Sequence, residues 1–307
     1  MHRFPNKSIG AGGLLLAACL LATSAPAQTT SEGLSPTLAN IKRTHVVRLG
    51  YRESSPPFSF LDHSNRPIGY SLELCEAIVE EIGVEVDDAN LKIEYVKVTS
   101  DDRIPAVVDN KIDLECGSTT ANAERAKLVA FSPLIFVAGT KLMVPKASTI
   151  SAPTDLKGKT VVVTKGTTNE QAMHAIDKKF SLGLNIATSP DHELSYQMLV
   201  DGKADAFATD DILLYGLIAR HKAQGQFKVT GEYLSYDPYG IMFRKGEPQL
   251  KAVVERTFQK LGSGRDLIPL YNKWFVARLP TGEKLGVSIS PQLEEAFKVL
   301  DDKHGSN

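Results

Sequence analysis

The chain has 307 residues, a length that suggests two domains of ordinary size. Charged residues make up 23% of it and hydrophobic residues 42%, which argues against a disordered chain. The 35 basic and 36 acidic residues nearly balance, so charge gives no reason to expect a nucleic acid or an anionic membrane as partner. Three cysteines are too few for a disulfide-stapled scaffold or a CxxC zinc site.

The first segment is typical of an export signal rather than of folded structure. A basic start precedes an apolar run over 9–22, which is too short to span a bilayer comfortably, and small residues then end at Ala27. We therefore expect residues 1–27 to be a signal peptide and the mature chain to be exported. Cys19 also fits a lipobox, whose cysteine would carry a lipid anchor. We favour the soluble form, because the apolar run continues past this cysteine.

Two cysteines remain in the mature chain, Cys75 and Cys116. An oxidising compartment permits a disulfide between them. Two buried free thiols are the alternative. We favour the free thiols, because a sequence cannot show that two Cα atoms are close enough to be bridged.

The first half of the mature chain alternates strands and helices. Residues 28–37 are rich in Thr, Ser, Gly and Pro and are expected to form a mobile leader. Periodicity then predicts strand, helix, strand, short helix and strand, in that order, over 45–50, 70–83, 92–98, 103–110 and 112–117. This order implies a parallel sheet with right-handed crossovers.

The same order recurs in a second unit. Strand, helix, weak strand, helix and strand are predicted over 159–164, 167–178, 184–188, 192–200 and 204–209. Thr167 and Glu170 have the spacing of a capping box at the start of the first of these helices. The turn 108–113 (VDNKID) is echoed at 200–205 (VDGKAD), so the two units are expected to be two lobes of one design.

Two extended segments connect the units, at 135–144 and 232–244. Two connecting segments are expected when one lobe is inserted into the sequence of the other, whereas two consecutive domains need only one. Helices at 248–262 and 265–277 are expected to return to the first lobe. The predicted boundaries are residues 40–138 plus 238–285 for lobe 1, 139–237 for lobe 2 and 286–307 for a polar C-terminal tail with an amphipathic stretch at 291–300.

Polar side chains gather directly after the predicted strands. Ligands of open parallel sheets bind beyond the carboxyl ends of the strands, so these residues are expected to converge on a cleft between the lobes. The candidates for this site are Arg52, Ser100, Arg103, Ser118, Thr120, Arg125, Thr167, Thr168, His192 and Asp210.

This set of side chains matches an anionic zwitterion. An α-carboxylate calls for a guanidinium with hydroxyl and backbone donors, and the helix start at Thr167–Thr168 adds donors and a favourable dipole. An ammonium calls for a carboxylate such as Asp210. Two further arginines would serve a second carboxylate, because a buried charge without a partner is very costly.

Each candidate also has an ordinary structural interpretation, which the sequence leaves open. Arg52 could be a solvated loop residue, and Arg103 could simply begin a helix. Arg125 could pair with Glu124 or Asp101 at the surface. In the same way, Asp210 could be only a helix N-cap and His192 a structural histidine.

The sequence resembles the periplasmic solute-binding proteins of amino-acid ABC transporters, and most closely their glutamate/aspartate-binding branch. The stretches that carry the resemblance occur together and in order over about residues 40–280: GYRESSPPFSF (50–60), IGYSLELC (68–75), TSDDRIP (99–105), DLECGSTTANAERAKLVAFS (113–132), DLKGKTVVVTKGTT (155–168), DHELSYQMLVDGKADAFATDD (191–211), YGIMFRK (239–245) and YNKWF (271–275).

The resemblance implies a type II periplasmic binding protein fold of class α/β, with two lobes of mainly parallel sheet joined by two extended hinge crossings. It also implies a role for each candidate residue. Arg125, with Thr120 and Thr168, would clamp the α-carboxylate; Asp210 would accept from the ammonium, and Ser118 would add a hydrogen bond. Arg52, Ser100, Arg103 and His192 would hold a side-chain carboxylate.

The function expected from this resemblance is reversible capture of L-glutamate or L-aspartate and delivery to a membrane permease. We expect a periplasmic monomer that needs no cofactor and catalyses no reaction. The alternative is a dehydratase on the same fold, acting on a prephenate-like diacid, but neither Glu53 nor Asp101 has the apolar pocket that a general acid needs. The sequence contains no phosphate-binding glycine loop, HExxH motif or Cys/His cluster.

Overall fold

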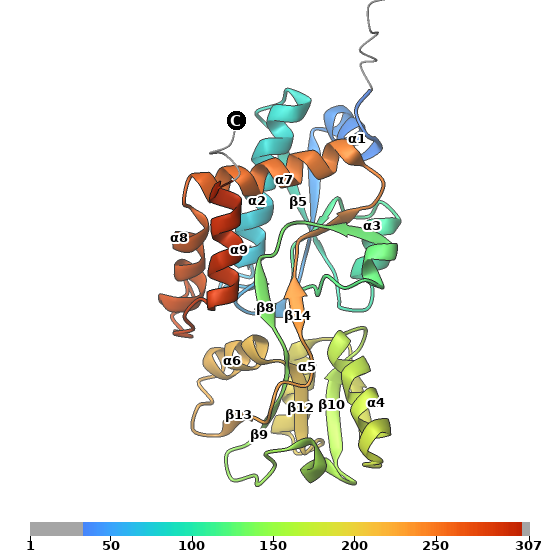
Figure 1. Cartoon of the computed structure of the whole chain (residues 1–307), viewed down its shortest axis with the longest axis vertical. Coiled ribbons are helices and arrows are strands. Elements are labelled where there is room, and N and C mark those ends of the chain that lie inside the picture. The colour runs from blue at the N-terminus through green and yellow to red at the C-terminus, as the bar shows by residue number, and fades with distance from the viewer. Residues whose placement is uncertain (1–32, 303–307) are drawn as a thin grey trace, which may run out of the picture. The chain divides into compact units, whose positions relative to one another are not determined.

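Two five-stranded sheets, each flanked by helices, organise the part of the chain that the computed structural model describes, residues 33–302 (Figure 1). The predicted signal peptide, its cleavage site at Ala27 and the lipobox cysteine Cys19 lie outside the described residues. No helix within 33–302 combines the length and apolar character needed to cross a bilayer.

The first sheet has the strand order β5-β1-β6-β15-β7. Strand β1 is parallel to β5 and β6, whereas β15 is antiparallel to β6 and β7. The strands are β1 (Val46–Tyr51), β5 (Lys92–Lys97), β6 (Leu114–Glu115), β7 (Val129–Phe131) and β15 (Met242–Arg244). Helices α2 (Tyr70–Val86), α3 (Arg103–Val108) and α7 (Pro248–Ser263) accompany this sheet, and α2 packs against α7.

The second sheet has the order β11-β10-β12-β9-β13. Its first three strands are parallel, and β9 runs antiparallel to β12 and β13. The strands are β9 (Thr140–Pro145), β10 (Thr160–Thr164), β11 (Asn185–Ser189), β12 (Ala206–Asp210) and β13 (Phe227–Thr230), with helices α4 (Thr168–Phe180), α5 (His192–Val200) and α6 (Asp211–Arg220).

Side-chain alternation on β10 explains why helices cover both faces of the second sheet. Val161 and Val163 belong to one buried cluster with Met173 of α4, whereas Val162 belongs to another with Leu217 of α6. Successive strand residues point to opposite faces, so a run of valines needs apolar cover on both sides. The parallel α/β character predicted from the sequence is confirmed.

Two short antiparallel strands, β8 (Phe136–Ala138) and β14 (Asp237–Tyr239), pair side by side where the chain passes between the sheets (Figure 1). Phe136 and Tyr239 from these strands join a buried aromatic cluster with Phe58 and Phe275. Ring centroids within the cluster lie 4.9–6.1 Å apart, the range of favourable aromatic pairs. This packing anchors both crossing strands to the first sheet's core. The exact lobe boundaries stay a prediction.

The remaining elements are short. A small three-stranded sheet comprises β2 (Ser54–Ser55), β3 (Ser59–Leu61) and β4 (Pro67–Ile68). Near the C-terminus, α8 (Leu267–Tyr271) continues as a π-helical turn at Asn272–Val276, and α9 (Pro291–Asp302) packs on α7 and α8. Short 3₁₀ turns lie at Arg125–Lys127 and Pro153–Leu156. The amphipathic stretch predicted at 291–300 is a helix that buries Leu293 and Phe297.

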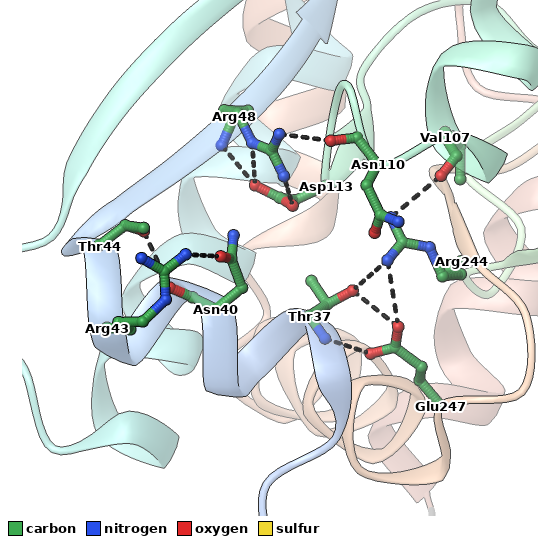
Figure 2. A network of polar contacts seen from close by, with 10 residues as sticks. All are labelled: Thr37, Asn40, Arg43, Thr44, Arg48, Val107, Asn110, Asp113, Arg244 and Glu247. Carbon is green, nitrogen blue, oxygen red and sulfur yellow. Dashed lines mark hydrogen bonds and ion pairs between the residues drawn. The ribbon is translucent and has the colours of Figure 1, made fainter.

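The predicted mobile leader is wrong at its C-terminal end, because α1 (Pro36–Thr44) begins within it. Thr37 donates from its backbone N and its Oγ1 to the buried Glu247, at 3.0 and 2.8 Å (Figure 2). Arg244 donates to Thr37 Oγ1 and pairs with Glu247 at 3.5 Å. These contacts fasten α1 to the start of α7.

The preference for two free thiols is also wrong, because Cys75 and Cys116 form a disulfide. Their Cα atoms lie 6.2 Å apart, within the range that a disulfide spans. The bond ties α2 to the residue that follows β6. The sequence could not establish this distance, because the two cysteines are 41 positions apart in the chain.

Removal of this disulfide is expected to destabilise the protein by about 2–4 kcal/mol, because the bond restricts the unfolded chain across a long loop. Urea unfolding of the wild type and of the Cys75→Ala/Cys116→Ala double variant measures the difference. A reducing agent should lower the unfolding midpoint of the wild type and leave that of the double variant unchanged. Equal midpoints for all four samples would contradict a stabilising disulfide.

Candidate functional site

The structure brings the sequence-predicted site residues together at the carboxyl ends of strands from both sheets. Eight of the ten line one small cavity, together with Asn169 and Leu213: Ser100, Arg103, Ser118, Thr120, Thr167, Thr168, His192 and Asp210. Arg125 and Arg52 are not among the lining residues: Arg125 bonds to the carbonyls of Thr120 and Gly166, and the charge of Arg52 acts on His192. Their roles toward a ligand stay predictions.

Arg125 is buried, so the surface pairings with Glu124 or Asp101 do not occur. Its Nη1 donates to the Thr120 carbonyl at 3.0 Å and its Nη2 to the Gly166 carbonyl at 3.4 Å. Burial and the neighbouring Arg103 lower its pKa to about 9, which leaves the group charged at neutral pH. The guanidinium thus bridges from the first sheet to the loop before α4.

Arg52 and Arg103 are more deeply buried, with 1% and 2% of their surfaces exposed. Arg103 is indeed the first residue of α3, but its Nη1 reaches inward to Thr119 Oγ1 at 2.8 Å. Burial and the charge of Arg103 lower the pKa of Arg52 to about 10. Burial likewise lowers the pKa of Arg103. The interpretation of Arg52 as a solvated loop residue is wrong.

Several buried polar atoms of this cluster have no protein partner. They are Nη1 and Nη2 of Arg52, Nε of Arg103, Oγ of Ser100 and Oγ of Ser118. Within residues 33–302, no ion pair joins Arg52, Arg103 or Arg125 to a carboxylate. Buried donors are costly to leave unsatisfied, so the arrangement suits a ligand that brings acceptors, above all carboxylate oxygens.

Asp210 supplies the opposite charge. It precedes α6 but makes no side-chain cap hydrogen bond, so the interpretation as a simple N-cap is wrong. Instead it accepts from Asn169 Nδ2 at 2.8 Å and from the Tyr239 hydroxyl. Burial, with a further contribution from Asp237, raises the pKa of Asp210 to about 7. A buried acid of this kind gains most from a cationic partner such as an ammonium.

His192 begins α5 and is buried, with Nδ1 hydrogen-bonded to Thr164 Oγ1 at 2.7 Å. Asp191, not His192, caps the helix by accepting from the Leu194 backbone N. Burial and the charges of Arg52 and Arg103 hold the pKa of His192 well below its ordinary value. The imidazole is therefore neutral and offers a hydrogen bond rather than a charge.

Contacts join residues after β6 to residues at the start of α4, and so connect the two sheets. Thr120 Oγ1 and Thr168 Oγ1 share a hydrogen bond of 3.3 Å, and Thr168 is the first residue of α4 after its cap Thr167. Thr167 Oγ1 accepts from the Glu170 backbone N at 3.1 Å, which confirms the N-cap half of the predicted capping box. The Glu170 side chain accepts from the Gly166 backbone N instead of the Thr167 backbone N, so the reciprocal half is replaced. At the rim, Lys165 Nζ pairs with Asp101 at 2.8 Å.

Five further polar residues of the site escaped the sequence prediction. Thr119 bonds to both Arg103 and Glu115. Asn169 and Tyr239 each donate a hydrogen bond to Asp210, and Asp237 accepts one from Thr120. Asp237 and Tyr239 belong to the crossing strand β14. Glu115 left no distinctive signal, because in the predicted strand 112–117 it alternates with apolar residues just as Asp113 does, which is the pattern of an ordinary strand with one polar face. Among residues 33–302, no group of three or more His, Cys, Asp and Glu side chains is placed to hold a metal ion.

Comparison with known proteins agrees with this geometry. A family described as bacterial extracellular solute-binding proteins, family 3, matches residues 47–277. The L-glutamate/L-aspartate-binding protein of Pseudomonas aeruginosa is 39% identical, over 94% of this chain and 96% of that protein. The glutamate/aspartate import solute-binding protein of Salmonella typhimurium is 36% identical, over 92% and 94% of the two chains.

Among solved structures, an ancestral arginine-binding protein bound to arginine superposes with a TM-score of 0.68 at 30% identity. The match covers 75% of this chain and 98% of that one. The type II periplasmic binding protein fold is therefore confirmed. Because that protein holds a cationic ligand, the fold alone does not decide which amino acid this chain takes.

The raised pKa of Asp210 predicts a specific pH dependence of stability in the ligand-free protein. The native state keeps a proton on Asp210 that the unfolded state loses near pH 4, so stability falls as the pH rises from about 4 to 7. Across this window the free energy of unfolding of the wild type should fall by about 2–4 kcal/mol relative to that of Asp210→Asn, whose side chain cannot titrate.

Urea unfolding at pH 5 and pH 8, on protein refolded to remove bound amino acid, measures this difference. Asp109→Asn changes an exposed carboxylate and serves as the control, which should follow the wild type. Parallel pH profiles for the wild type and Asp210→Asn would contradict the buried, protonated carboxyl.

Proposed function

Because the chain belongs to the bacterial extracellular solute-binding proteins of family 3, we propose that it reversibly binds an acidic L-amino acid, glutamate or aspartate, and delivers it to the membrane permease of an ABC importer. The observation that carries this proposal is the burial of three guanidinium groups, none of which forms an ion pair with a carboxylate of residues 33–302. A ligand with two carboxylates supplies the missing acceptors.

The charges around the cavity divide into two ends, which fits an acidic amino acid. Asp210 and Asp237 both act on Arg125, so an ammonium and an α-carboxylate are accommodated together at that end. Arg52 and Arg103 both act on the neutral His192 at the other end. Glu115 and Asp102 act on both of these arginines, but within residues 33–302 neither carboxylate forms an ion pair with them. A second carboxylate on the ligand side chain matches this end in charge.

The ligand contacts follow from this division. Arg125, Thr120 and Thr168 bind the α-carboxylate, and Thr167 holds the start of α4 in place as its N-cap. Asp210 accepts from the ammonium, and Ser118 adds a hydrogen bond. Arg52, Ser100, Arg103 and His192 hold the side-chain carboxylate. Glutamate and aspartate differ by one methylene group, which changes the binding free energy by only about 1–3 kcal/mol, so both are retained as ligands.

Capture works by closure of two lobes, residues 40–138 plus 238–285 and residues 139–237, about the crossing strands β8 and β14. A ligand that contacts both lobes stabilises the closed form by its differential affinity for that form. The hydrogen bond between Thr120 and Thr168, and that from Arg125 to the Gly166 carbonyl, support this mechanism because each spans the two lobes.

The protein acts as a binding protein rather than an enzyme, as its similarity to the glutamate/aspartate-binding proteins of Pseudomonas aeruginosa and Salmonella typhimurium supports. No observation favours the dehydratase alternative: Glu53 pairs with Lys97 at 2.6 Å and Asp101 with Lys165, both at exposed positions. We propose a soluble periplasmic monomer whose loaded form meets the permease.

Two arginine substitutions separate the two ends of the site. Arg125→Ala should abolish amino-acid binding, because every α-amino acid needs the clamp on its α-carboxylate. Arg103→Ala should keep binding but reduce the preference for glutamate over glutamine, because only the side-chain carboxylate loses a charge-assisted partner.

Isothermal titration calorimetry with glutamate, aspartate and glutamine measures both effects. Arg278→Ala, at an exposed arginine distant in sequence from the site, is the matched control and should bind as the wild type does. Unchanged selectivity in both site variants would refute the assigned contacts.

A glycine on α6 tests closure independently of ligand contacts. A Cβ added at Gly216 would overlap the carbonyl oxygen of Pro56, which belongs to the other lobe. Gly216→Ala should therefore weaken glutamate binding at least tenfold, mainly through faster dissociation. It should not destabilise the fold, because Ala is favoured over Gly in a helix by about 1 kcal/mol.

Stopped-flow dissociation and thermal unfolding measure the two quantities. Gly225→Ala adds a methyl group into open space in the same lobe and should leave both unchanged. If Gly216→Ala binds glutamate with the affinity and dissociation rate of the wild type, closure against Pro56 is not part of binding.

A further inference from the structure

Glu115 is an ionisable residue in the middle of a buried sheet. It is fully buried on β6, opposite Gly50 of β1 and Met242 of β15. Its carboxylate acts on all three site arginines and counteracts the effect of burial on the pKa of Arg52, Arg103 and Arg125. A buried charge at this point calls for an explanation beyond packing.

A chain of hydrogen bonds connects Glu115 to one of these arginines. Thr119 Oγ1 donates to Glu115 Oε2 at 2.6 Å and accepts from Arg103 Nη1 at 2.8 Å. A hydroxyl has one hydrogen to donate, and Glu115 takes it, so the Thr119 lone pairs face the guanidinium. The carboxylate thereby sets the orientation of the Thr119 hydroxyl, and the hydroxyl holds the Arg103 guanidinium in place.

The backbone around Glu115 is held in place from α2. The disulfide attaches Cys116 to Cys75, and Ser71 Oγ donates to the Gly117 carbonyl at 2.7 Å. A Cβ at Gly117 would overlap Glu115 Oε1, so the glycine leaves the carboxylate the place that it occupies. The segment that carries both Glu115 and Thr119 is therefore anchored to α2 at Cys116 and Gly117.

We propose that Glu115 and Thr119 are positioning residues that aim Arg103 at the ligand's side-chain carboxylate and so set the preference for an acidic over an amide side chain. This inference rests on the proposed function of the site. Neither residue lines the cavity, so both act through Arg103 rather than by touching the ligand.

Positioning matters because arginine has a long side chain whose ordering is costly, and because its planar fork discriminates only when it is aligned. An aligned guanidinium forms charge-assisted hydrogen bonds with a carboxylate that an isosteric amide cannot match. A guanidinium that is free to rotate loses this alignment and much of the discrimination, while the α-carboxylate clamp at Arg125 is unaffected.

The decisive experiment compares the affinities for L-glutamate and L-glutamine by calorimetry. Thr119→Val keeps the size of the side chain but removes the hydroxyl, and it should lower the ratio of glutamate to glutamine affinity at least tenfold. Thr119→Ser restores the hydroxyl and should stay within threefold of the wild type. Thr257→Val removes another buried hydroxyl, one bonded to the Val253 carbonyl, and is the matched control.

A double variant covers the case in which Thr119→Val fails to fold because it leaves Glu115 without its donor. Thr119→Val/Glu115→Leu replaces both partners by apolar groups, which is far less disruptive. Its ratio of glutamate to glutamine affinity should also be at least tenfold lower than that of the wild type. Loss of the negative charge alone would strengthen the preference for an acid, so a decrease identifies lost positioning.

Folded variants without the Thr119 hydroxyl that keep the wild-type ratio, or that weaken both ligands equally, would overturn the inference. A wild-type protein that binds glutamine as tightly as glutamate would instead overturn the proposed function, and the inference with it.

Discussion

Everything in the site depends on the burial of three positive charges close to one another. Arg52 follows a strand of the first sheet, and Arg103 and Arg125 each begin a helical turn beside it. Burial disfavours the charged form of each guanidinium, and no carboxylate within residues 33–302 forms an ion pair that offsets this cost. Such a cluster is stable only when its surroundings are rigid and when acceptors arrive from outside. The rigid first sheet with its disulfide meets the first condition, and an acidic ligand meets the second.

The same residues connect the site to the crossing strands. Asp237 accepts from Thr120 Oγ1 at 3.0 Å, and Tyr239 donates to Asp210. Tyr239 in turn packs on Phe58 and Phe136 in the aromatic cluster. A change of charge at Asp210 would therefore act on the strand β14, which is the connection that the proposed closure requires.

Local sequence signals predicted most of the fold. The helix at His192–Val200 was predicted with the observed bounds, and Asp191 caps its start. Features set by long-range contacts were missed. Helix α1 depends on Thr37 meeting Glu247, 210 residues away, and the disulfide depends on a distance that no local pattern encodes. The site candidates shared one signal, their place after strands, which Glu115 within a strand lacks.

The most direct test of the account is a crystal structure of the protein with L-glutamate bound. The account predicts one carboxylate on Arg125, the ammonium on Asp210, and the second carboxylate within hydrogen-bond distance of Arg52 or Arg103. A ligand whose side-chain carboxylate faces solvent, with Arg52 and Arg103 still unpartnered, would contradict the claim that these buried charges select an acidic ligand.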